Sequence, residues 1–420
     1  MKRVNSRIPE FRKWTPEDRR RFLSDLLDLN ENERGKLSNV GSLADETAGR
    51  MVENFFMNME IPVGLATNFL INDREYLIPM AIEEPSVIAA CSNAARIARI
   101  RGGFTAVSTE NIMFGQIQII GTDNPELAKI KILRDKKKIL DLANTVSNTL
   151  RERNRGAIDL EVRNLEYGKG LIIHLKVDVL DAMGANVING MAERISPLIE
   201  EITGGEVVLR ILSNLTPLRV TRVSATFDLD AMGGERVARR FIDAYEMART
   251  DVFRATTHNK GIMNGIDAVL LATLNDWRQA EANAHAYASL GGRYTSLTRY
   301  SRDSEGNIAG SIEIPLALGT VGGATSAVDK AKLSMKILNV GSAMEFQEVV
   351  ASVGLAQNFA AMRALSDEGI QRGHMRLHSR NIAISAGAKG ELIDIISNQM
   401  IADGNISYSH AMELLKTGGK

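Results

Sequence analysis

The residues of this chain that could do chemistry are concentrated between Ala255 and Arg278. The stretch from Ala255 to Asp267 combines Lys260 with that aspartate, two amides, and several glycine and hydroxyl residues typical of turns. We predict a loop here, because the mixture fits neither an amphipathic helix face nor an alternating strand. A lysine beside a carboxylate can stabilise an oxyanion or form a Schiff base. The alternative is a solvated loop with a weak surface ion pair.

Composition limits the class of protein. The 420 residues are enough for two or three domains, and 44% hydrophobic with 24% charged residues is ordinary for a globular chain. Lys and Arg number 51 and Asp and Glu number 51, so the zero net charge favours neither nucleic acid nor an anionic membrane as partner. The one cysteine, Cys91, excludes an internal disulfide, and its alanine neighbours predict burial. No leader-like or membrane-spanning run is present, so we expect a cytoplasmic protein.

The first hundred residues predict helices on both sides of one strand. Thr15 supplies an N-cap hydroxyl and Pro16 a first-turn proline. The expected elements are a helix over residues 15–27, a helix over 42–56, a strand over 76–82 and an alanine-rich helix over 87–100. Glu83 and Glu84 lie between that strand and the last helix, where acids often border a site.

The periodicity changes from Gln116 onward into an alternation of strands and helices. The expected elements are a strand over 116–120, one long basic helix over 124–150, strands over 158–165 and 170–179, a helix over 182–202 and a strand over 206–212. This β-α-β-β-α-β order predicts a ferredoxin-like unit inserted into a larger domain. A strand over 220–227, helices over 234–250 and 276–289, a hairpin near 302–307 and a helical tail follow.

Two common nucleotide-binding motifs are missing from the sequence. No G-x-G-x-x-G follows a strand and no G-x-x-x-x-G-K-[ST] is present, which argues against a Rossmann enzyme and a P-loop ATPase. The stretch from Asp181 to Asn186 instead opens the second helix of the inserted unit with small residues and free N–H groups, where a phosphate could bind. Small residues at a helix start serve packing equally well.

Histidine is scarce, with six residues in the chain. His374 and His378 have the spacing of two metal ligands on one helix face, but no third ligand accompanies them. We therefore expect no metal and interpret His374 as an acid–base residue. His174 is interpreted as a strand residue, and His285 and His410 as helix-surface or packing residues.

Six motifs together resemble the 3-hydroxy-3-methylglutaryl-coenzyme A (HMG-CoA) reductase family, in its soluble bacterial and archaeal second class. They are residues 83–86, 181–186, 257–265, 275–278, 322–325 and 373–375, in the family's order and rough spacing. The resemblance extends from about Arg7 into the tail. It implies a four-electron reduction of the HMG-CoA thioester to mevalonate and CoA with two reduced nicotinamide coenzymes, or the reverse reaction.

The resemblance also implies the roles of four catalytic residues. Lys260 resembles the lysine that stabilises the developing oxyanion, and Asp276 the aspartate that supports it. Glu84 resembles the acid that exchanges a proton with the aldehyde-level oxygen. His374 resembles the histidine that protonates the departing CoA thiolate. A fixed cation suits an oxyanion, and an imidazole suits a thiolate leaving group.

Further residues resemble the binding groups of the family. The implied substrate-binding residues are Arg254 for the carboxylate, Asn264 in the lysine network, Ser86 and Asn214 as polar groups, and Arg12 for a CoA phosphate. The implied coenzyme-binding residues are Asp181, Met183, Gly184 and Asn186 at the helix start. Homodimers whose active sites are built from both chains are implied as well.

With these roles the expected fold is α+β in three parts. A large mixed helical and sheet domain over residues 1–110 and 218–374 would bind HMG-CoA. The inserted ferredoxin-like domain over residues 111–217 would bind the nicotinamide coenzyme. Residues 375–420 would form a C-terminal helical flap that closes over the site and expels water.

Two positions depart from the pattern of the relatives. NAD-specific relatives place an acid where this chain has Ser147. A serine there, with Lys136, Lys137, Lys138, Arg151 and Arg153 not far off in sequence, favours NADPH over NADH. The alternative is that the basic residues only solvate a helix. The family's interface motif Glu-Asn-Val-Ile-Gly is replaced by Glu-Asn-Phe-Phe-Met at residues 53–57, which changes the expected interface packing.

Two other functions stay open on these residues. A Schiff base at Lys260 would make the chain an aldolase-like enzyme, although no barrel-like βα repetition is present. A non-catalytic CoA-binding or nucleotide-binding protein is the second alternative. It would bind its ligand largely unchanged without Lys260.

Overall fold

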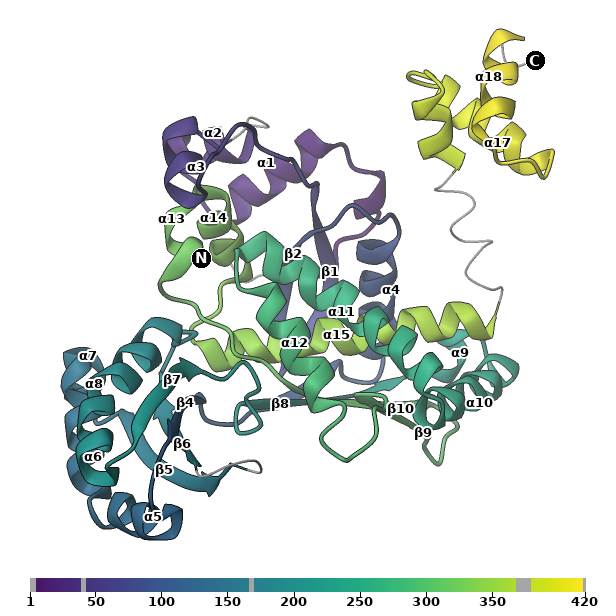
Figure 1. Ribbon diagram of the computed structural model, residues 1–420. Helices are drawn as coiled ribbons and strands as arrows, with labels where there is room; N and C mark the ends of the chain where they lie inside the picture. The colour runs from purple at the N-terminus through teal and green to yellow at the C-terminus, as the bar shows by residue number, and fades with distance from the viewer. Residues whose placement is uncertain (1–4, 39–42, 166–169, 368–378, 418–420) are drawn as a thin grey trace.

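The computed structural model describes residues 5–38, 43–165, 170–367 and 379–417, which fold around two separate β-sheets (Figure 1). The mixed α+β fold class expected from the sequence is confirmed. Within these residues, no helix is long and apolar enough to cross a membrane.

The larger sheet has six strands in the order β2-β1-β3-β8-β10-β9. They are β1 (Val63–Ile71), β2 (Arg74–Ala81), β3 (Phe104–Ser108), β8 (Val220–Phe227), β9 (Thr298–Arg302) and β10 (Ile308–Pro315). Neighbouring strands are antiparallel except β1 and β3. Because β3 pairs directly with β8, the chain leaves this sheet after β3 and returns to it only after the smaller sheet is complete.

Helices that pack on the larger sheet carry the main hydrophobic core. The long ones are α4 (Val87–Arg99), α10 (Glu235–Thr250), α11 (Val252–Thr273) and α15 (Ala343–Ser366), and the shorter ones are α9 (Leu229–Met232), α12 (Trp277–Tyr287), α13 (Gly323–Ala327) and α14 (Asp329–Leu338). In this core Phe227 and Phe359 stack with ring centroids 3.6 Å apart. Cys91 of α4 is fully buried, as predicted, with its Sγ 3.9 Å from the carbonyl oxygen of Val353 in α15. Burial raises the pKa of the Cys91 thiol.

The stretch around Lys260 is helical, so the prediction of a loop was wrong: it forms the middle of α11. The glycines of this stretch were interpreted as turn residues, but Gly265 lies in the helix and allows close packing. A β-carbon on Gly265 would lie 2.9 Å from Cβ of Gln357, and one on Gly354 would lie 3.0 Å from Cδ1 of Ile266. The two glycines therefore let α11 and α15 cross closely.

The smaller sheet has four antiparallel strands in the order β5-β6-β4-β7. They are β4 (Ile112–Ile120), β5 (Gly156–Asn164), β6 (Gly170–Asp178) and β7 (Glu206–Leu212), with α8 (Ala185–Thr203) between the last two. This is the strand order of a β-α-β-β-α-β unit. The second connection of the unit is thus the helix that the sequence predicted.

The first connection of the unit differs from the prediction of one basic helix over 124–150. It is divided into α5 (Pro125–Arg134), α6 (Lys136–Ala143), the 3-10 turn η2 (Asn144–Val146) and α7 (Asn148–Glu152). The Asn144 side chain accepts from the backbone N–H of Ala157 (2.8 Å) and donates to its carbonyl (2.9 Å). Ser147 then caps α7. Short polar side chains that bond the backbone interrupt helices in this way.

The chain termini form helices outside the two sheets. They are η1 (Phe11–Lys13), α1 (Pro16–Leu26), α2 (Glu31–Ser38) and α3 (Asp45–Met51) at the start, and α17 (Leu392–Ala402) and α18 (Tyr408–Lys416) at the end. Thr15 and Asp18 form a capping box for α1. α3 is shorter than the predicted helix over 42–56, because Val52 is extended and Asn54 has a φ of 54°. The helical tail is confirmed, and α17 and α18 pack around a small core of their own, apart from the sheets in Figure 1.

Candidate active site

A cavity of about 350 Å³ lies between the turn that follows β2 and one face of α11, with α15 on its far side. Residues of α11 that are three or four positions apart point to it, because they share one side of the helix. The structure thus brings five predicted site residues together. They are Glu84, Ser86, Arg254, Lys260 and Asn264.

Lys260 and Glu84 form an ion pair at this cavity. Nζ of Lys260 lies 3.3 Å from Oε2 of Glu84, although the two residues are far apart in sequence. The lysine side chain is 61% exposed and the glutamate side chain 34%, so the pair contributes little to stability. It does place a cation and an acid side by side. A carbonyl oxygen bound here would meet a positive charge and a proton source.

Arg254 supplies a second cation in the first turn of α11. Its backbone N–H donates to the N-cap residue Asp251 (2.7 Å), and its Nη2 lies 3.2 Å from Sδ of Met362. Within the described residues no carboxylate forms an ion pair with it. Burial lowers the pKa of Arg254, so its charge is incompletely solvated and favours an anionic ligand group such as a carboxylate.

His258 lines the same cavity and was missed by the sequence analysis. Its side chain is buried and its Nε2 lies 2.6 Å from Oγ1 of Thr298. Burial, helped by the charge of Arg254, lowers the pKa of His258 to about 3, so the imidazole is neutral. His258 follows Arg254 by four residues, which places both side chains on one face of a helix. This spacing could have revealed His258 only if a helix had been predicted here.

Ser86 has an unusual backbone conformation. Its φ of 78° lies in the left-handed region, which costs a non-glycine residue ~1–3 kcal/mol. It occupies the N-cap of α4, yet its hydroxyl makes no capping hydrogen bond. The hydroxyl therefore remains available to the cavity, and strain of this kind is common at functional sites.

Asp276 lies just beyond the C-terminal end of α11, whereas Lys260 lies near the middle of that helix. It caps α12 by accepting from the N–H of Gln279 (3.1 Å), and its Oδ1 lies 3.4 Å from Nη2 of Arg278. Because an α-helix rises ~1.5 Å per residue, the stretch from Lys260 to Thr273 alone spans about 20 Å. A lysine side chain cannot bridge that distance. One chain therefore does not bring Asp276 to Lys260.

The predicted coenzyme loop between β6 and α8 reaches this second end of α11. Gly319 donates its N–H to Oδ1 of Asn275 (3.0 Å), and a β-carbon on Gly319 would lie 2.8 Å from the backbone nitrogen of Met183. The carbonyl of Asn214 accepts from Nε2 of Gln279 (2.9 Å). The structure thus gathers Asp276, Asn214 and the Asp181–Asn186 loop away from the cavity at Lys260.

The side chain of Asp181 holds this loop in place. Its Oδ1 accepts from the N–H of Ala343 (2.8 Å) at the start of α15. Gly184 has a φ of 102°, and a β-carbon there would lie 2.5 Å from Cγ1 of Val179. α8 then begins with an exposed Asn186 and no acid in its first turn. Free N–H groups at such an end can bind phosphate.

Arg219 also holds the loop and was not predicted. It is fully buried, and its Nη1 donates to the carbonyl of Ala182 (3.2 Å) while its Nη2 donates to the carbonyl of Leu318. Burial lowers its pKa to about 9, against the opposing effect of Asp178 and Asp181. A buried cation thereby ties the loop between β6 and α8 to the segment that follows β10.

The remaining predicted residues lie elsewhere or outside the described side chains. Oγ of Ser147 accepts from the N–H of Leu150 (3.3 Å), and Arg151 follows in the same short helix. The backbone of Arg12 lies in η1, but its side chain is outside the described part. His374 lies outside the described residues altogether.

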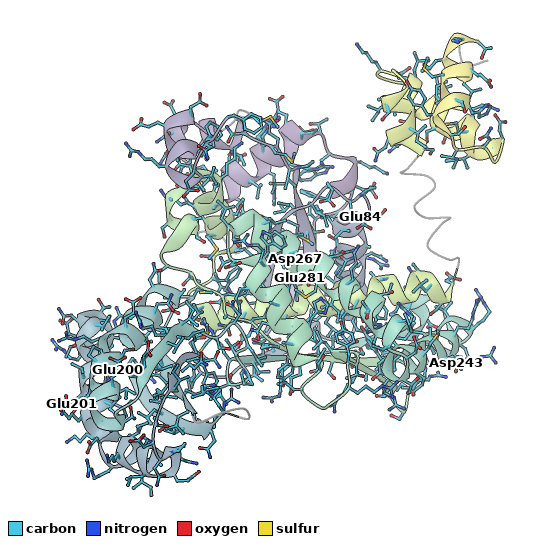
Figure 2. All side chains as sticks on the ribbon, viewed as in Figure 1. Glu84, Glu200, Glu201, Asp243, Asp267 and Glu281 are labelled. Atoms are coloured by element: carbon cyan, nitrogen blue, oxygen red, sulfur yellow. The ribbon has the colours of Figure 1, made fainter. Side chains whose placement is uncertain are left out.

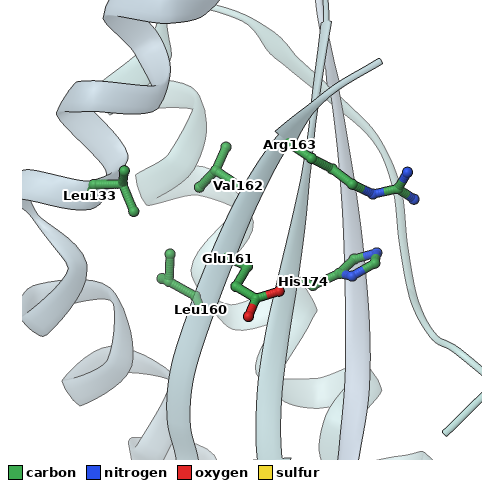
Figure 3. A pocket seen from close by; sticks show the side chains of 6 residues that line it. All are labelled: Leu133, Leu160, Glu161, Val162, Arg163 and His174. Carbon is green, nitrogen blue, oxygen red and sulfur yellow. The ribbon is translucent and has the colours of Figure 1, made fainter. Parts of the chain in front are cut away.

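A second cavity of about 340 Å³ lies at the β5 edge of the smaller sheet (Figure 3). Two of its polar side chains already have partners: Glu161 pairs with Lys176, and Nε2 of His174 lies 2.9 Å from Nε2 of Gln116. Burial lowers the pKa of His174, and the positive charge of Arg163 lowers it further by a smaller amount. The prediction that His174 is a strand residue is confirmed, and this cavity is not the candidate active site.

Comparison with known proteins decides the family. The family model described as hydroxymethylglutaryl-coenzyme A reductase matches residues 15–379. The chain belongs to this family. It is 51% identical over 415 residues to the HMG-CoA reductase of Archaeoglobus fulgidus. That alignment covers 98% of this chain and 95% of the relative. It is 37% identical over 379 residues to the probable HMG-CoA reductase of Borreliella burgdorferi, covering 87% of this chain and 86% of that relative.

A solved structure agrees with this assignment. The class II HMG-CoA reductase of Streptococcus pneumoniae, described as bound to NADPH in open conformations, superposes with a TM-score of 0.81 at 35% identity. The match covers 97% of this chain and 100% of that one. The chain is therefore an NAD(P)H-dependent oxidoreductase of the HMG-CoA reductase family, and the aldolase and non-catalytic alternatives are not favoured.

Proposed function

We propose that the Glu84–Lys260 cavity is where this chain converts the HMG-CoA thioester to mevalonate, or runs the reverse reaction. The observation that carries the proposal is the cation and acid 3.3 Å apart in a cavity that also holds Arg254. The overall reaction consumes two hydrides and two protons and releases CoA as a free thiol. The site therefore has to stabilise an oxyanion twice and manage two proton transfers.

Lys260 is the group that faces the reacting oxygen in this proposal. When the thioester carbon gains a hydride, its oxygen becomes an anion that Lys260 stabilises. The C–S bond then breaks, and the electron pair leaves on the CoA sulfur, whose protonation the resemblance assigns to His374. The aldehyde carbon gains the second hydride, and Glu84 gives its proton to the resulting alkoxide. An oxyanion contact of this kind contributes ~10²–10³-fold to the rate.

The other polar groups would bind and orient the substrate. Arg254 is the proposed partner of the HMG carboxylate, because it is a half-buried cation with no ion-pair partner among the described residues. The further proposed contacts are Ser86 and Asn264 in the cavity, Asn214 at the second end of α11, and Arg12 for a CoA phosphate.

The reduced nicotinamide coenzyme supplies the hydride when it is bound. The residues present fit it: a β-carbon at Gly184 would fill the turn, and α8 starts without an acid that would repel a pyrophosphate. Met183 and Asn186 would lie along it, while Asp181 would hold the loop. Ser147 carries no charge that would repel a 2′-phosphate, so we propose NADPH as the preferred coenzyme and NADH as the alternative.

A homodimer would complete the active site. Asp276 and the coenzyme loop lie about 20 Å along α11 from Lys260 in one chain, so a second chain would have to supply one half. Large apolar side chains are exposed on the parts of the chain near the cavity and the N-terminal helices: Phe56 (84%), Met59 (82%) and Phe253 (82%). Exposed apolar groups of this size are typical of protein interfaces.

The direct test is HMG-CoA-dependent oxidation of NADPH and of NADH by the purified protein, side by side, with Lys260→Ala as control. We expect turnover with both coenzymes, faster with NADPH, and a loss of at least ~10²-fold in the variant. Folded protein that is inactive with both coenzymes would contradict the proposal. A higher rate with NADH would contradict only the coenzyme preference.

A further inference from the structure

Arg219 is a fully buried cation just before β8. Its Nη1 donates to the carbonyl oxygens of Ala182 (3.2 Å) and Met183 (3.5 Å), which belong to the loop between β6 and α8. Its Nη2 donates to the carbonyl oxygen of Leu318, in the segment that follows β10. Among the described residues no carboxylate forms an ion pair with it. The cation therefore binds uncharged backbone oxygens from two segments that lie far apart in the sequence.

Gln347 of α15 completes the surroundings of the guanidinium. One atom of its side-chain amide lies 3.0 Å from both Nη2 and Nε of Arg219, and this atom is the amide oxygen, because two N–H donors cannot bond each other. All three guanidinium nitrogens thus have acceptors, which come from the loop, the segment after β10 and α15. A lysine could not reproduce this set of bonds, because its three N–H groups share one nitrogen atom.

The backbone of the same two segments is also in direct contact. The N–H of Thr320 donates to the carbonyl oxygen of Asp181 (2.9 Å). Gly319 lies so close to the loop that a β-carbon there would be 2.8 Å from the backbone nitrogen of Met183. The loop is therefore held by the side chain of Arg219 and by a close approach that only a glycine at position 319 permits.

These contacts fix how α8 begins. Met183 is followed by Gly184, whose φ of 102° leads the chain into the helix. The N–H groups of the first turn have no acceptor within the helix, and groups of this kind can bind phosphate. Their direction depends on the peptide planes that precede them. Arg219 binds the carbonyl oxygens of the two planes on either side of Met183.

We infer that Arg219 is a positioning residue for the nicotinamide coenzyme, on the basis of the coenzyme site proposed above. It holds the loop whose N–H groups would bind the pyrophosphate. Because its partners are uncharged oxygens in three different segments, the planar arrangement of its donors matters as well as its charge. Gly319 supports the same loop from the segment after β10.

The effect should be confined to the coenzyme. The loop belongs to the unit that carries Glu200 and Glu201 of α8, and Figure 2 shows these two residues well apart from Glu84 at the Lys260 cavity. None of the residues that the side chain of Arg219 bonds lines that cavity. Binding of HMG-CoA there should therefore depend little on Arg219.

Binding measurements on the full-length chain test this role. In Arg219→Met and Arg219→Lys we expect the Kd for NADPH, from titration of its fluorescence, to rise about tenfold or more, because small displacements of binding groups are costly. The KM for NADPH should rise in parallel. The Kd for HMG-CoA, from calorimetry, should stay within about 2-fold. The matched control is Arg222→Met, which removes an exposed arginine of β8 that pairs with Glu313.

A second variant keeps every charge and tests the loop separately, since a buried arginine also contributes to folding. Gly319→Ala would press a β-carbon against the backbone of Met183 and displace the loop. We expect the Kd for NADPH to rise about threefold or more, again with little change for HMG-CoA. Gly291→Ala is the matched control, because a β-carbon at that exposed position meets nothing within 4 Å.

Circular dichroism shows which variants are folded. Folded Arg219→Lys or Gly319→Ala that binds NADPH as tightly as wild type would overturn the positioning role. Equal losses of affinity for NADPH and HMG-CoA would overturn it too, because they indicate a general loss of structure. Wild type that binds neither NADPH nor NADH would contradict the proposed coenzyme site itself, and the positioning role with it.

Discussion

Two cations with different surroundings share the candidate active site. Lys260 is 61% exposed and pairs with Glu84, so its charge is free to follow a reacting oxygen. Arg254 is half-buried, and burial lowers its pKa. A ligand carboxylate would form an ion pair with Arg254 and offset the cost of its incomplete solvation. The different environments of the two side chains fit the catalytic role proposed for Lys260 and the binding role proposed for Arg254.

The prediction at this scale concerns Arg254→Met, which keeps the side-chain volume and removes the charge. KM for HMG-CoA is expected to rise about 10–100-fold, because a charge-assisted hydrogen bond contributes ~1.5–3 kcal/mol. KM for the coenzyme and kcat should change little. Steady-state kinetics with each substrate varied in turn gives this separation. An unchanged KM for HMG-CoA would show that the carboxylate binds elsewhere.

Motifs pointed to residues that line the candidate cavity, but not to the residues that hold the neighbouring loops in place. Glu84 and Lys260 could be predicted because each belongs to a distinctive run of residue types. Arg219 could not, since a single arginine before a strand gives no sign of burial. Its partners, the carbonyls of Ala182 and Leu318, come from segments that only the fold brings near.

At the scale of elements, α11 positions the site. It carries Arg254 and Lys260 on one face and ends beside Asp276, so its length sets the separation of the two groups of site residues. The strand order of the smaller sheet could be predicted from alternation and turn residues. The helical state of α11 could not, because Gly261 and Gly265 are residues typical of a turn, and α15, on which Gly265 packs, lies about 90 residues further along the chain.

The same substitution at these two glycines is expected to have opposite effects. Gly265→Ala places a β-carbon 2.9 Å from Cβ of Gln357 and should destabilise the protein by ~1–3 kcal/mol. Gly261→Ala meets nothing within 4 Å and should stabilise α11 by ~0.5–1 kcal/mol. Urea unfolding of the two variants beside wild type measures both. If Gly265→Ala destabilised the protein no more than Gly261→Ala does, the close crossing of α11 and α15 would not depend on Gly265.

At the scale of the whole molecule, the predicted site residues of the described chain fall into two separate groups. One holds Glu84, Arg254 and Lys260, and the other holds Asp276 with the coenzyme loop. A sequence motif identifies a residue but does not say whether it acts in the site of its own chain or in that of a partner chain. The separation along α11 is what makes a shared site the natural arrangement.

A shared site predicts complementation between two inactive variants. Lys260→Ala and Asp276→Ala are each expected to be inactive as homodimers. If they are unfolded together and refolded as a mixture, about a quarter of all sites should contain neither substitution, since half of the dimers are mixed and each has one intact site. Recovery of about a quarter of wild-type activity is therefore expected. A mixture as inactive as its components would place each active site within one chain.

Cys91 allows the motion of this core to be followed. Its thiol, the one cysteine of the chain, is fully buried between α4 and α15, and a thiol reagent needs both access and a thiolate. Labelling can proceed only while these two helices separate, so its rate reports how often the core opens, as amide exchange does for the backbone. Ala90 of α4 and Ala361 of α15 line the cavity proposed to bind the substrate. A bound substrate would hold those helices together and protect the thiol, which turns one unreactive sulfur atom into a reporter of occupancy.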